Sequence, residues 1–359
     1  MKTIIHFHPN WNYADKFISP LIKAEEEIGY ESQLVTALNN PINNLQIDFQ
    51  ILKTPYKLPV IIFKLVKLLY INRPDIVFCH NTTSSVLPLI IARILFIKNI
   101  IYFNHGVPFI GYQGFFRYFL RGLEKINCAL STNIITVSNE MRLILGNITK
   151  KKIEIINNGS ACGIDLEKNK NEKINVTKLK KKLNFGLKDK IFLFIGRPNK
   201  RKGFHDVIKI WEKKFSFNKN FKLILLGIDS LDFKKINKTI PKNVFPLSFV
   251  KNIDDYHFMA DYFFMTSHHE GLNYSVLESF YFKTIVLSNN IPSVLELVND
   301  RETGFLINKN CPKNFYDIVN ECEKNINLKR KIVKNASKVV TKYDRKKFMK
   351  NYKKFLEQF

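Results

Sequence analysis

The sequence has few cysteines, and their spacing excludes the two common structural roles of that residue. The five cysteines are an odd number in 359 residues, and no two of them form a Cys-x-x-Cys pair. A disulfide framework or a structural zinc site would need paired or clustered cysteines. We therefore expect free, buried thiols and a reducing compartment.

Long hydrophobic runs are also absent. A membrane-spanning helix needs about 20 successive apolar residues, and the best candidate, residues 87–103, contains Arg93 and Lys98. Residues 1–8 lack the long apolar segment and the small-residue cleavage site of a signal peptide, so we interpret them as a first buried strand. With 45% hydrophobic and 25% charged residues, the chain has enough apolar material for two ordinary domains.

Acidic residues are scarce relative to basic ones. The 57 Lys and Arg against 31 Asp and Glu give a net charge of +26, which suits nucleic acid, an anionic membrane surface or an anionic small substrate. A compositional bias toward Lys, Asn, Ile and Phe would explain the charge without any partner. No signature of a nucleic-acid-binding fold occurs, so we expect no nucleic acid and favour the membrane. The basic, aromatic segment 109–121 could lie at such a surface or pack on a sheet, and we expect segment 56–70 to pack.

Short apolar runs alternate with amphipathic segments along the whole chain, a rhythm typical of βαβ units and parallel sheets. Strands are predicted at residues 3–7, 33–36, 76–79, 100–103, 134–137, 153–156, 191–195, 223–226, 245–247, 262–265, 284–287 and 305–307. Helices are predicted at 14–27, 59–70, 84–96, 115–130, 139–145, 204–214, 254–260, 274–281, 292–298 and 312–323, with a helical, basic tail over 329–359. We predict an α/β protein with domains at 1–165 and 183–340, a Lys/Asn-rich linker at 166–182 and a C-terminal helix at 341–359.

Ligands of parallel sheets bind outside the carboxyl ends of the strands, and the segment that follows strand 262–265 carries the strongest signal. A polar turn with Glu270 and Gly271 leads into a helix for which Asn273 is a good N-cap. The N–H groups at such a helix start suit a diphosphate, and Gly271 lets a ligand approach closely. Glu278 lies a little more than one turn into the helix, so one carboxylate can meet a sugar while the other meets ribose hydroxyls. A capped helix with a surface glutamate is the alternative.

Basic side chains follow strand 191–195. The guanidinium of Arg197 suits bidentate phosphate contact, and Lys202 adds a point charge. Arg201, in the same basic run, can share this role. Ordinary solvated surface charge is the alternative for all three.

Other aromatic and imidazole side chains fall near predicted strand ends. His105 and His80 either face a ligand or are satisfied buried histidines, and of His268 and His269 we expect one to line the site and the other to pack. Trp11 and Tyr13 can stack on a sugar face or belong to the core.

Taken in chain order, these segments resemble the retaining glycosyltransferases of family 4, which have the GT-B fold. The resemblance spans roughly residues 74–307 and rests on the ordered set Asn104-His105-Gly106, Ile135-Thr136-Val137-Ser138, Asn158-Gly159 with Gly163-Ile164-Asp165, Gly196-Arg197 with Lys202-Gly203, Glu270 with Glu278, and Thr303-Gly304-Phe305-Leu306. It implies two Rossmann-like domains with parallel sheets facing across a cleft, and a C-terminal helix that packs back on the N-terminal domain. One departure is that residues 7–13, where these enzymes often carry a Gly-rich loop, contain no glycine.

The resemblance also implies the roles of the candidate residues. They are catalytic Glu270 and His105; donor-binding Arg197, Lys202, Gly271, Leu272, Asn273 and Glu278; and, as candidate acceptor or cleft residues, Trp11, Tyr13, His80 and His269. The implied reaction moves a sugar, with retention, from a nucleotide-sugar, in the first place a UDP-sugar, to a glycan or lipid-linked oligosaccharide in bacterial O-antigen or capsule synthesis. The enzyme would act in the cytoplasm, peripherally on the inner face of the cell membrane.

No Asp-x-Asp triplet, the metal-holding motif of the other large glycosyltransferase fold, occurs in the sequence. We therefore expect no divalent metal and no cofactor, with positive side chains and a helix N-terminus stabilising the departing diphosphate. Two other functions are compatible with these motifs. One is a nucleotide-sugar epimerase or hydrolase, which would turn over donor without an acceptor, and the other is a non-catalytic sugar-nucleotide or glycan-binding subunit.

Overall fold

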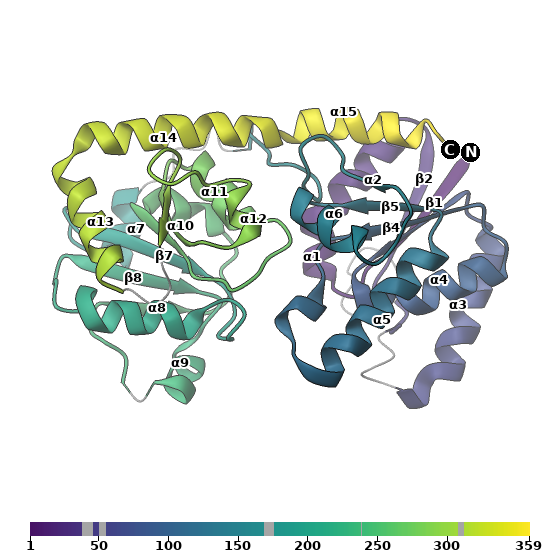
Figure 1. Cartoon of the computed structure of the whole chain (residues 1–359), viewed down its shortest axis with the longest axis horizontal. Helices are drawn as coiled ribbons and strands as arrows, with labels where there is room; N and C mark the ends of the chain where they lie inside the picture. Colours follow the sequence, from purple (N-terminus) through teal and green to yellow (C-terminus); the bar gives the residue numbers. More distant parts are fainter. Residues whose placement is uncertain (38–45, 50–54, 169–175, 238, 308–311) are drawn as a thin grey trace. The chain divides into compact units, whose positions relative to one another are not determined.

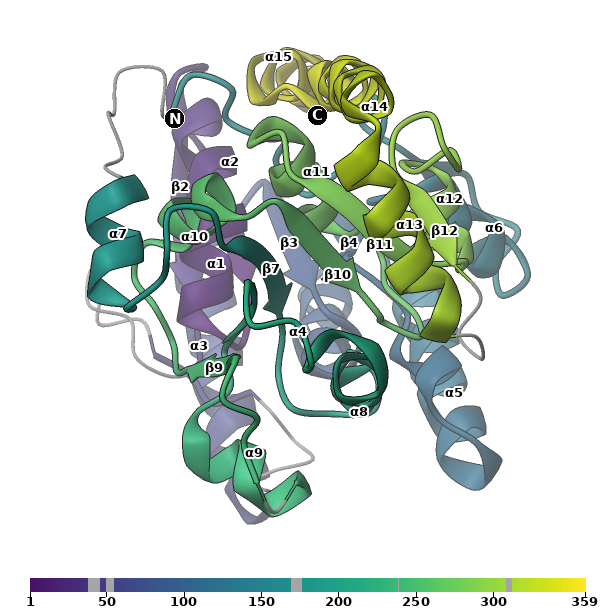
Figure 2. The ribbon, with the colours of Figure 1, turned by 90° about the vertical axis from the view of Figure 1, so that its left-hand side faces the viewer.

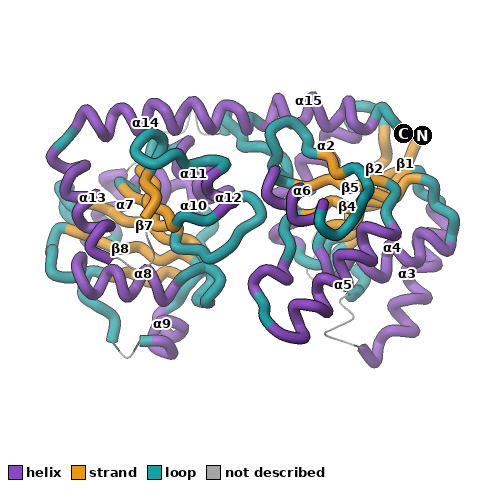
Figure 3. The backbone as a smooth tube through the Cα atoms, viewed as in Figure 1, coloured by secondary structure: helices purple, strands orange, loops and turns teal. Residues whose placement is uncertain are grey.

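A computed structural model describes residues 1–37, 46–49, 55–168, 176–237, 239–307 and 312–359. They form two compact units, one made of Met1–Gly163 with Tyr343–Phe359 and the other of Ile164–Lys342. Each unit holds a six-stranded parallel sheet, with strand orders β2-β1-β3-β4-β5-β6 and β12-β11-β10-β7-β8-β9. Helices flank the strands of each sheet (Figures 1 and 3). The predicted α/β class with two parallel-sheet domains is confirmed.

The N-terminal unit alternates strands and helices up to β6. Its elements are β1 (Lys2–Phe7), α1 (Trp11–Phe17), α2 (Ser19–Glu26), β2 (Tyr30–Val35), α3 (Leu58–Asn72), β3 (Ile76–His80), α4 (Thr82–Ile94), β4 (Asn99–Asn104), α5 (Gly114–Leu130), β5 (Asn133–Thr136), α6 (Asn139–Gly146) and β6 (Ile153–Glu154).

Side-chain alternation gives the strands of this sheet two different faces. Ile5, Phe7, Val77 and Cys79 pack in one apolar core with residues of α3 and α4. Because successive side chains of a strand point to opposite faces, His6 and Phe78 lie on the other side. That face has its own layer of helices.

The C-terminal unit repeats the pattern. Its elements are α7 (Val176–Lys182), β7 (Lys190–Ile195), α8 (Phe204–Ile210), β8 (Phe221–Leu226), α9 (Ser230–Ile236), β9 (Val244–Leu247), α10 (Ile253–Met259), β10 (Tyr262–Met265), α11 (Tyr274–Tyr281), β11 (Ile285–Asn289), α12 (Pro292–Leu295), β12 (Phe305–Ile307), α13 (Pro312–Lys324) and α14 (Ile326–Val340). Figure 2 shows α8 and α13 on one side of β7 and β10, and α7 and α10 on the other. Fully buried Trp211, Phe192 and Phe264 are part of the core on the α8 side.

The last helix, α15 (Arg345–Leu356), belongs to the N-terminal unit. It packs beside α2 (Figure 1), as the resemblance implies. Tyr352, fully buried, donates a hydrogen bond to Glu25 of α2, and Tyr30 donates one to the Leu356 carbonyl. The C-terminal segment therefore completes the helical layer over the His6 face of the first sheet.

Three predicted elements need correction. The helix predicted at 14–27 is two helices, because Pro20 lies in the first turn of α2 and cannot continue the hydrogen bonding of a preceding helix. The helix predicted at 204–214 ends at Ile210 and continues as a π-helical turn, Trp211–Phe215. The predicted linker lies partly outside the described residues, and its end, from Val176, forms α7. The pattern missed α9, whose N-cap Asp229 accepts a hydrogen bond from the Asp232 amide.

Candidate active site

Two loops at the carboxyl ends of β7 and β10 are fastened together in the C-terminal unit. Gly203 has φ +70°, and a Cβ at this position would lie 1.9 Å from the Thr266 carbonyl oxygen, so only glycine fits. The Thr266 hydroxyl donates to the Gly203 carbonyl at 2.9 Å, and the His268 amide donates to the Arg201 carbonyl at 2.8 Å. The basic loop that ends at Gly203 is therefore held against the loop that carries Glu270.

Glu270 bonds two cations of that basic loop. Lys202 Nζ lies 2.7 Å from Oε1 and Arg201 Nη1 lies 3.2 Å from Oε2. The carboxylate side chain is only 10% exposed, against 25% for Lys202 and 45% for Arg201. Burial raises the pKa of Glu270, but the charges of Lys202 and Arg201 outweigh burial, so its pKa lies below the ordinary value. The group is a buried anion with one cation beside each of its carboxylate oxygens.

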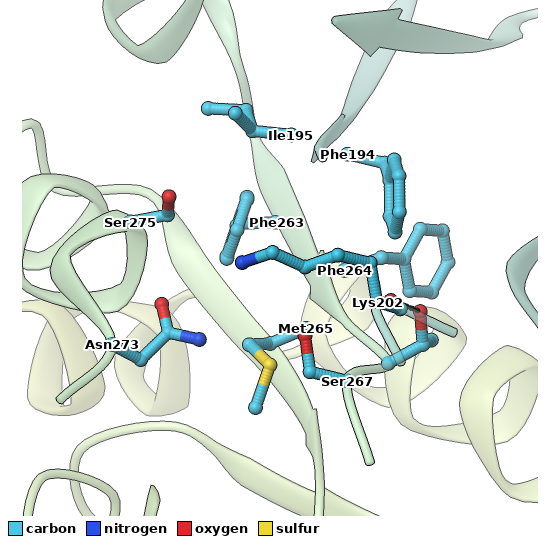
Figure 4. A pocket seen from close by; sticks show the side chains of 10 residues that line it. Phe194, Ile195, Lys202, Phe263, Phe264, Met265, Ser267, Asn273 and Ser275 are labelled. Carbon is cyan, nitrogen blue, oxygen red and sulfur yellow. Dashed lines mark hydrogen bonds between the residues drawn. The ribbon is translucent and has the colours of Figure 1, made fainter. Parts of the chain in front are cut away.

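A small pocket opens beside this ion triad. It is lined by Phe194, Ile195, Lys202, Phe263, Phe264, Met265, Thr266, Ser267, Asn273 and Ser275. In Figure 4 the ammonium group of Lys202 points toward the side lined by Asn273 and Ser275. Asn273 caps α11 as predicted, because its side-chain oxygen accepts a hydrogen bond from the Val276 amide at 3.0 Å. The pocket thus combines a lysine charge with the N-terminus of a helix, which is an arrangement that favours anions.

The remaining predicted donor residues lie around this centre. Gly271 is half-buried and Leu272 is buried in the turn before the cap. Arg197 is exposed. Glu278 lies with Oε2 3.7 Å from Nε2 of the fully buried His257, a neighbour that the sequence pattern did not reveal. Lys202 and Glu270 are therefore directly paired.

The two adjacent histidines have different surroundings. His268 is exposed and lies 2.7 Å from Asp206. His269 is half-buried, and burial, followed by the charge of Arg201, lowers its pKa. A neutral His269 can serve a ligand as donor or acceptor.

In the N-terminal unit the structure brings Tyr13, His80 and His105 together. Tyr13 meets the ring of His105 edge-on at 5.5 Å, and His80 Nδ1 lies 2.8 Å from His105 Nε2. Tyr13 also stacks on His8 at 4.6 Å. Trp11, by contrast, is half-buried against the small apolar cluster of Ala14, Ile18 and Leu34. Of the two aromatics after the first strand, only Tyr13 joins the histidine cluster.

Comparison with known proteins decides the family. Residues 23–166 match the family model described as Glycosyltransferase Family 4, and residues 175–339 match the model described as Glycosyl transferases group 1. The chain belongs to glycosyltransferase family 4. A curated relative is the capsular polysaccharide biosynthesis glycosyltransferase CapM of Staphylococcus aureus, which is 28% identical over 282 residues, 74% of this chain and 71% of CapM.

Solved structures place the transferase in the GT-B fold. The Anabaena protein HepE in complex with UDP-glucose superposes with a TM-score of 0.82 at 16% identity, covering 100% of both chains. WaaG, a glycosyltransferase involved in lipopolysaccharide biosynthesis, superposes with a TM-score of 0.73 at 13% identity and 98% coverage of both chains. At such identities the likeness establishes the fold alone.

A second buried carboxyl organises the loop of the transferase that contains His105. Glu124 of α5 accepts hydrogen bonds from Tyr102 at 2.8 Å and from Asn104 at 3.4 Å, and the Asn104 side-chain oxygen accepts from the Gly106 amide at 3.0 Å. Burial raises the pKa of Glu124 to about 7, although its hydrogen bonds oppose this. Glu124 was not predictable from the sequence, because it occupies what looks like an ordinary polar position within an amphipathic helix.

Three further findings bear on the predicted absences. Among the described residues, no group of three or more His, Cys, Asp or Glu side chains could hold a metal ion. Cys79, Cys128, Cys162 and Cys322 are buried and form no disulfide, and Cys311 lies outside the described residues. In the part of the transferase that the structure covers, no helix has the length and apolar character needed to cross a bilayer.

Proposed function

We propose that the transferase moves a sugar, with retention, from a UDP-sugar to a glycan or lipid-linked oligosaccharide, without a divalent metal. The observation that carries this proposal is the Glu270–Lys202–Arg201 triad at the N-cap of α11. HepE, whose fold this chain shares, was crystallised with UDP-glucose. The same position in a parallel sheet, at the carboxyl ends of its strands, is where nucleotides generally bind.

Charge explains how this site would act. Two cations and one anion leave the triad with a net positive charge, which attracts a diphosphate and stabilises it as it departs. Arg197 is exposed, and its guanidinium suits bidentate contact with the same phosphates. Glu270, which is ion-paired with Lys202 and Arg201, keeps its negative charge and can stabilise the positive charge that develops on the sugar ring.

The named roles of similar proteins support the proposed class of acceptor. CapM acts in capsular polysaccharide biosynthesis, and WaaG in lipopolysaccharide biosynthesis. We infer that this transferase extends a bacterial surface polysaccharide in the same way. An epimerase or hydrolase would instead release UDP without acceptor, so UDP release that depends on an added glycan acceptor would separate the reactions.

Nucleotide binding is the first test. UDP at about 100 times its dissociation constant should stabilise the folded protein by about 2.7 kcal/mol, seen as a rise in melting temperature. We expect Arg197→Ala to reduce the rise, with Lys209→Ala, which removes an exposed charge from α8 of the same unit, as the control. GDP, ADP and CMP should give smaller shifts. If no nucleotide shifts the melting temperature, a glycan-binding subunit becomes the better explanation.

Peripheral membrane binding is a further part of the proposal. The start of α5 exposes Phe115, Tyr118 and Phe116 by 83%, 72% and 43%, with Arg117 and Arg121 also exposed. Helix α4 contacts both α5 and α3. Helix α3 buries one face, as predicted, but Phe63 and Val60 on it are 67% and 57% exposed. Exposed aromatic and basic side chains on one helix are typical of binding to an anionic membrane surface.

Replacing both Phe115 and Tyr118 by Ser should lower binding to phosphatidylglycerol-containing vesicles about tenfold, since less apolar surface would enter the interface. Phe217→Ser, at a residue 81% exposed in the other unit, is the matched control. Vesicle flotation measures both. If the double variant, Phe217→Ser and the unmodified chain all bind the vesicles equally, the start of α5 is not a membrane-binding surface.

A further inference from the structure

A line of three buried side chains, Glu25, His6 and His80, leads to His105, which is half-buried. The carboxylate of Glu25 lies 3.0 and 3.1 Å from Nε2 of His6. His6 Nδ1 lies 3.0 Å from His80 Nε2, and His80 Nδ1 lies 2.8 Å from His105 Nε2. At the end of the line, His105 Nδ1 is buried and has no hydrogen-bond partner among the described residues.

The sheet topology produces this line. β3 lies between β1 and β4, and His6 is paired in register with Phe78, two positions before His80. His6 and His80 therefore share the face that lies opposite the α3 and α4 core, where α2 supplies Glu25. Glu25, His6 and His80 are all fully buried, so water does not interrupt the line.

Proton counting along the line gives one arrangement for neutral rings. A carboxylate can only accept, so His6 carries its proton on Nε2 and presents a lone pair at Nδ1. His80 must then donate from Nε2 and accept at Nδ1, and His105 must donate from Nε2. The neutral His105 is left with a lone pair on Nδ1.

The charge state of each group supports this count. Burial, then the neighbouring His105 and His6, lowers the pKa of His80 well below its ordinary value, and burial lowers that of His105 to about 3. Both rings are therefore neutral near pH 7. Glu25 accepts hydrogen bonds from the hydroxyls of Ser32 and Tyr352 as well as lying beside His6, so its carboxylate is the accepting end of the line.

We propose that Glu25, acting through His6 and His80, is a positioning residue that fixes His105 as the tautomer protonated on Nε2, so that Nδ1 accepts a hydrogen bond from a hydroxyl of the bound sugar substrate. This inference rests on the proposed function for its substrate. A ligand group that can only accept, such as a carbonyl or a carboxylate, would meet a lone pair at Nδ1 and be disfavoured.

The reversed proton arrangement defines the competing outcome. If His6 were an imidazolium paired with Glu25, each ring would donate in the opposite direction and His105 would carry its proton on Nδ1. That proton would be a buried donor without an acceptor among the described residues, a situation that is rarer in proteins than an unused lone pair. The neutral arrangement is therefore the one that the geometry favours.

Nitrogen NMR of the full chain, labelled with ¹⁵N in its histidine rings, reads the tautomers directly at pH 7.5. His105→Gln identifies the His105 signals by their loss. We expect His105 to show a protonated Nε2 and a lone-pair Nδ1. A protonated Nδ1 on His105, or an imidazolium at His6, would overturn the proposal.

Two substitutions at the middle of the line test the coupling. A glutamine amide can donate to His6 and accept from His105, so His80→Gln should keep the His105 tautomer. His80→Phe fills the space without polar atoms and should give a mixture of tautomers. Tyr352→Phe, which removes a donor to Glu25 but keeps the carboxylate, should leave the tautomer unchanged. If His80→Phe leaves His105 in a single tautomer, Glu25 does not control it.

Activity is a second and separate measurement. Losing one hydrogen bond to the sugar should raise the KM of His80→Phe for that sugar substrate about fivefold, with Tyr352→Phe close to the unmodified enzyme. Because the NMR result does not depend on turnover, a chain that shows the expected tautomers but transfers no sugar would retain the relay and refute the proposed function.

Discussion

Replacing Glu270 by Gln is expected to lower kcat/KM for sugar transfer about 100- to 1000-fold, the size of effect seen when one electrostatic group is lost from an active site. The amide keeps the shape of the side chain but carries no charge. Lys202 and Arg201 then lose their common anion, and no carboxylate remains to oppose positive charge on the sugar ring. Steady-state transfer of radiolabelled sugar to a polysaccharide acceptor measures the loss.

The control for this variant must separate catalysis from folding. Glu302→Gln removes one negative charge from an exposed turn of the same unit and should leave kcat/KM unchanged. Both variants should bind UDP, because the phosphate contacts are cationic. A Glu270→Gln enzyme with full activity would show that the triad only braces the two loops, and that the sugar is met by other groups.

The strands of this fold were predictable because parallel sheets bury both faces. Each of β1 to β12 overlaps a predicted apolar run, including the short β6. Helix limits were less predictable, since they depend on single residues such as Pro20, which divides α1 from α2. The α9 segment lacks a strong apolar period, so the pattern gave no signal there.

The candidate site was predictable only in part. Glu270, Lys202 and Asn273 follow strand ends within recognisable local motifs, and the structure brings Glu270 and Lys202 into contact. The preference of Arg201 over Arg197 for Glu270 depends on how the loop before Gly203 folds, which the residue order does not disclose. His6 and Glu25 were missed because their contacts with His80 and Tyr352 span 74 and 327 positions of the chain.

The second large effect is expected at Gly203, where substitution by Ala should lower the free energy of unfolding by about 3 kcal/mol. Left-handed backbone costs about 1 kcal/mol for a residue with a Cβ, and overpacking commonly adds about 1–3 kcal/mol. The new methyl group would lie 1.9 Å from the Thr266 carbonyl oxygen, so the two loops must separate. Chemical denaturation measures the loss of stability, and UDP affinity should fall with it because Lys202 precedes Gly203.

Gly29→Ala distinguishes the close contact from the backbone conformation alone. Gly29 also has a positive φ, +88°, but no atom lies within 4 Å of a Cβ built there. This variant should lose only about 1 kcal/mol, the cost of the left-handed backbone. Equal losses for Gly203→Ala and Gly29→Ala would mean that the loops after β7 and β10 yield easily. The ion triad would then depend on its own charges, and not on the glycine, to hold Lys202 beside Glu270.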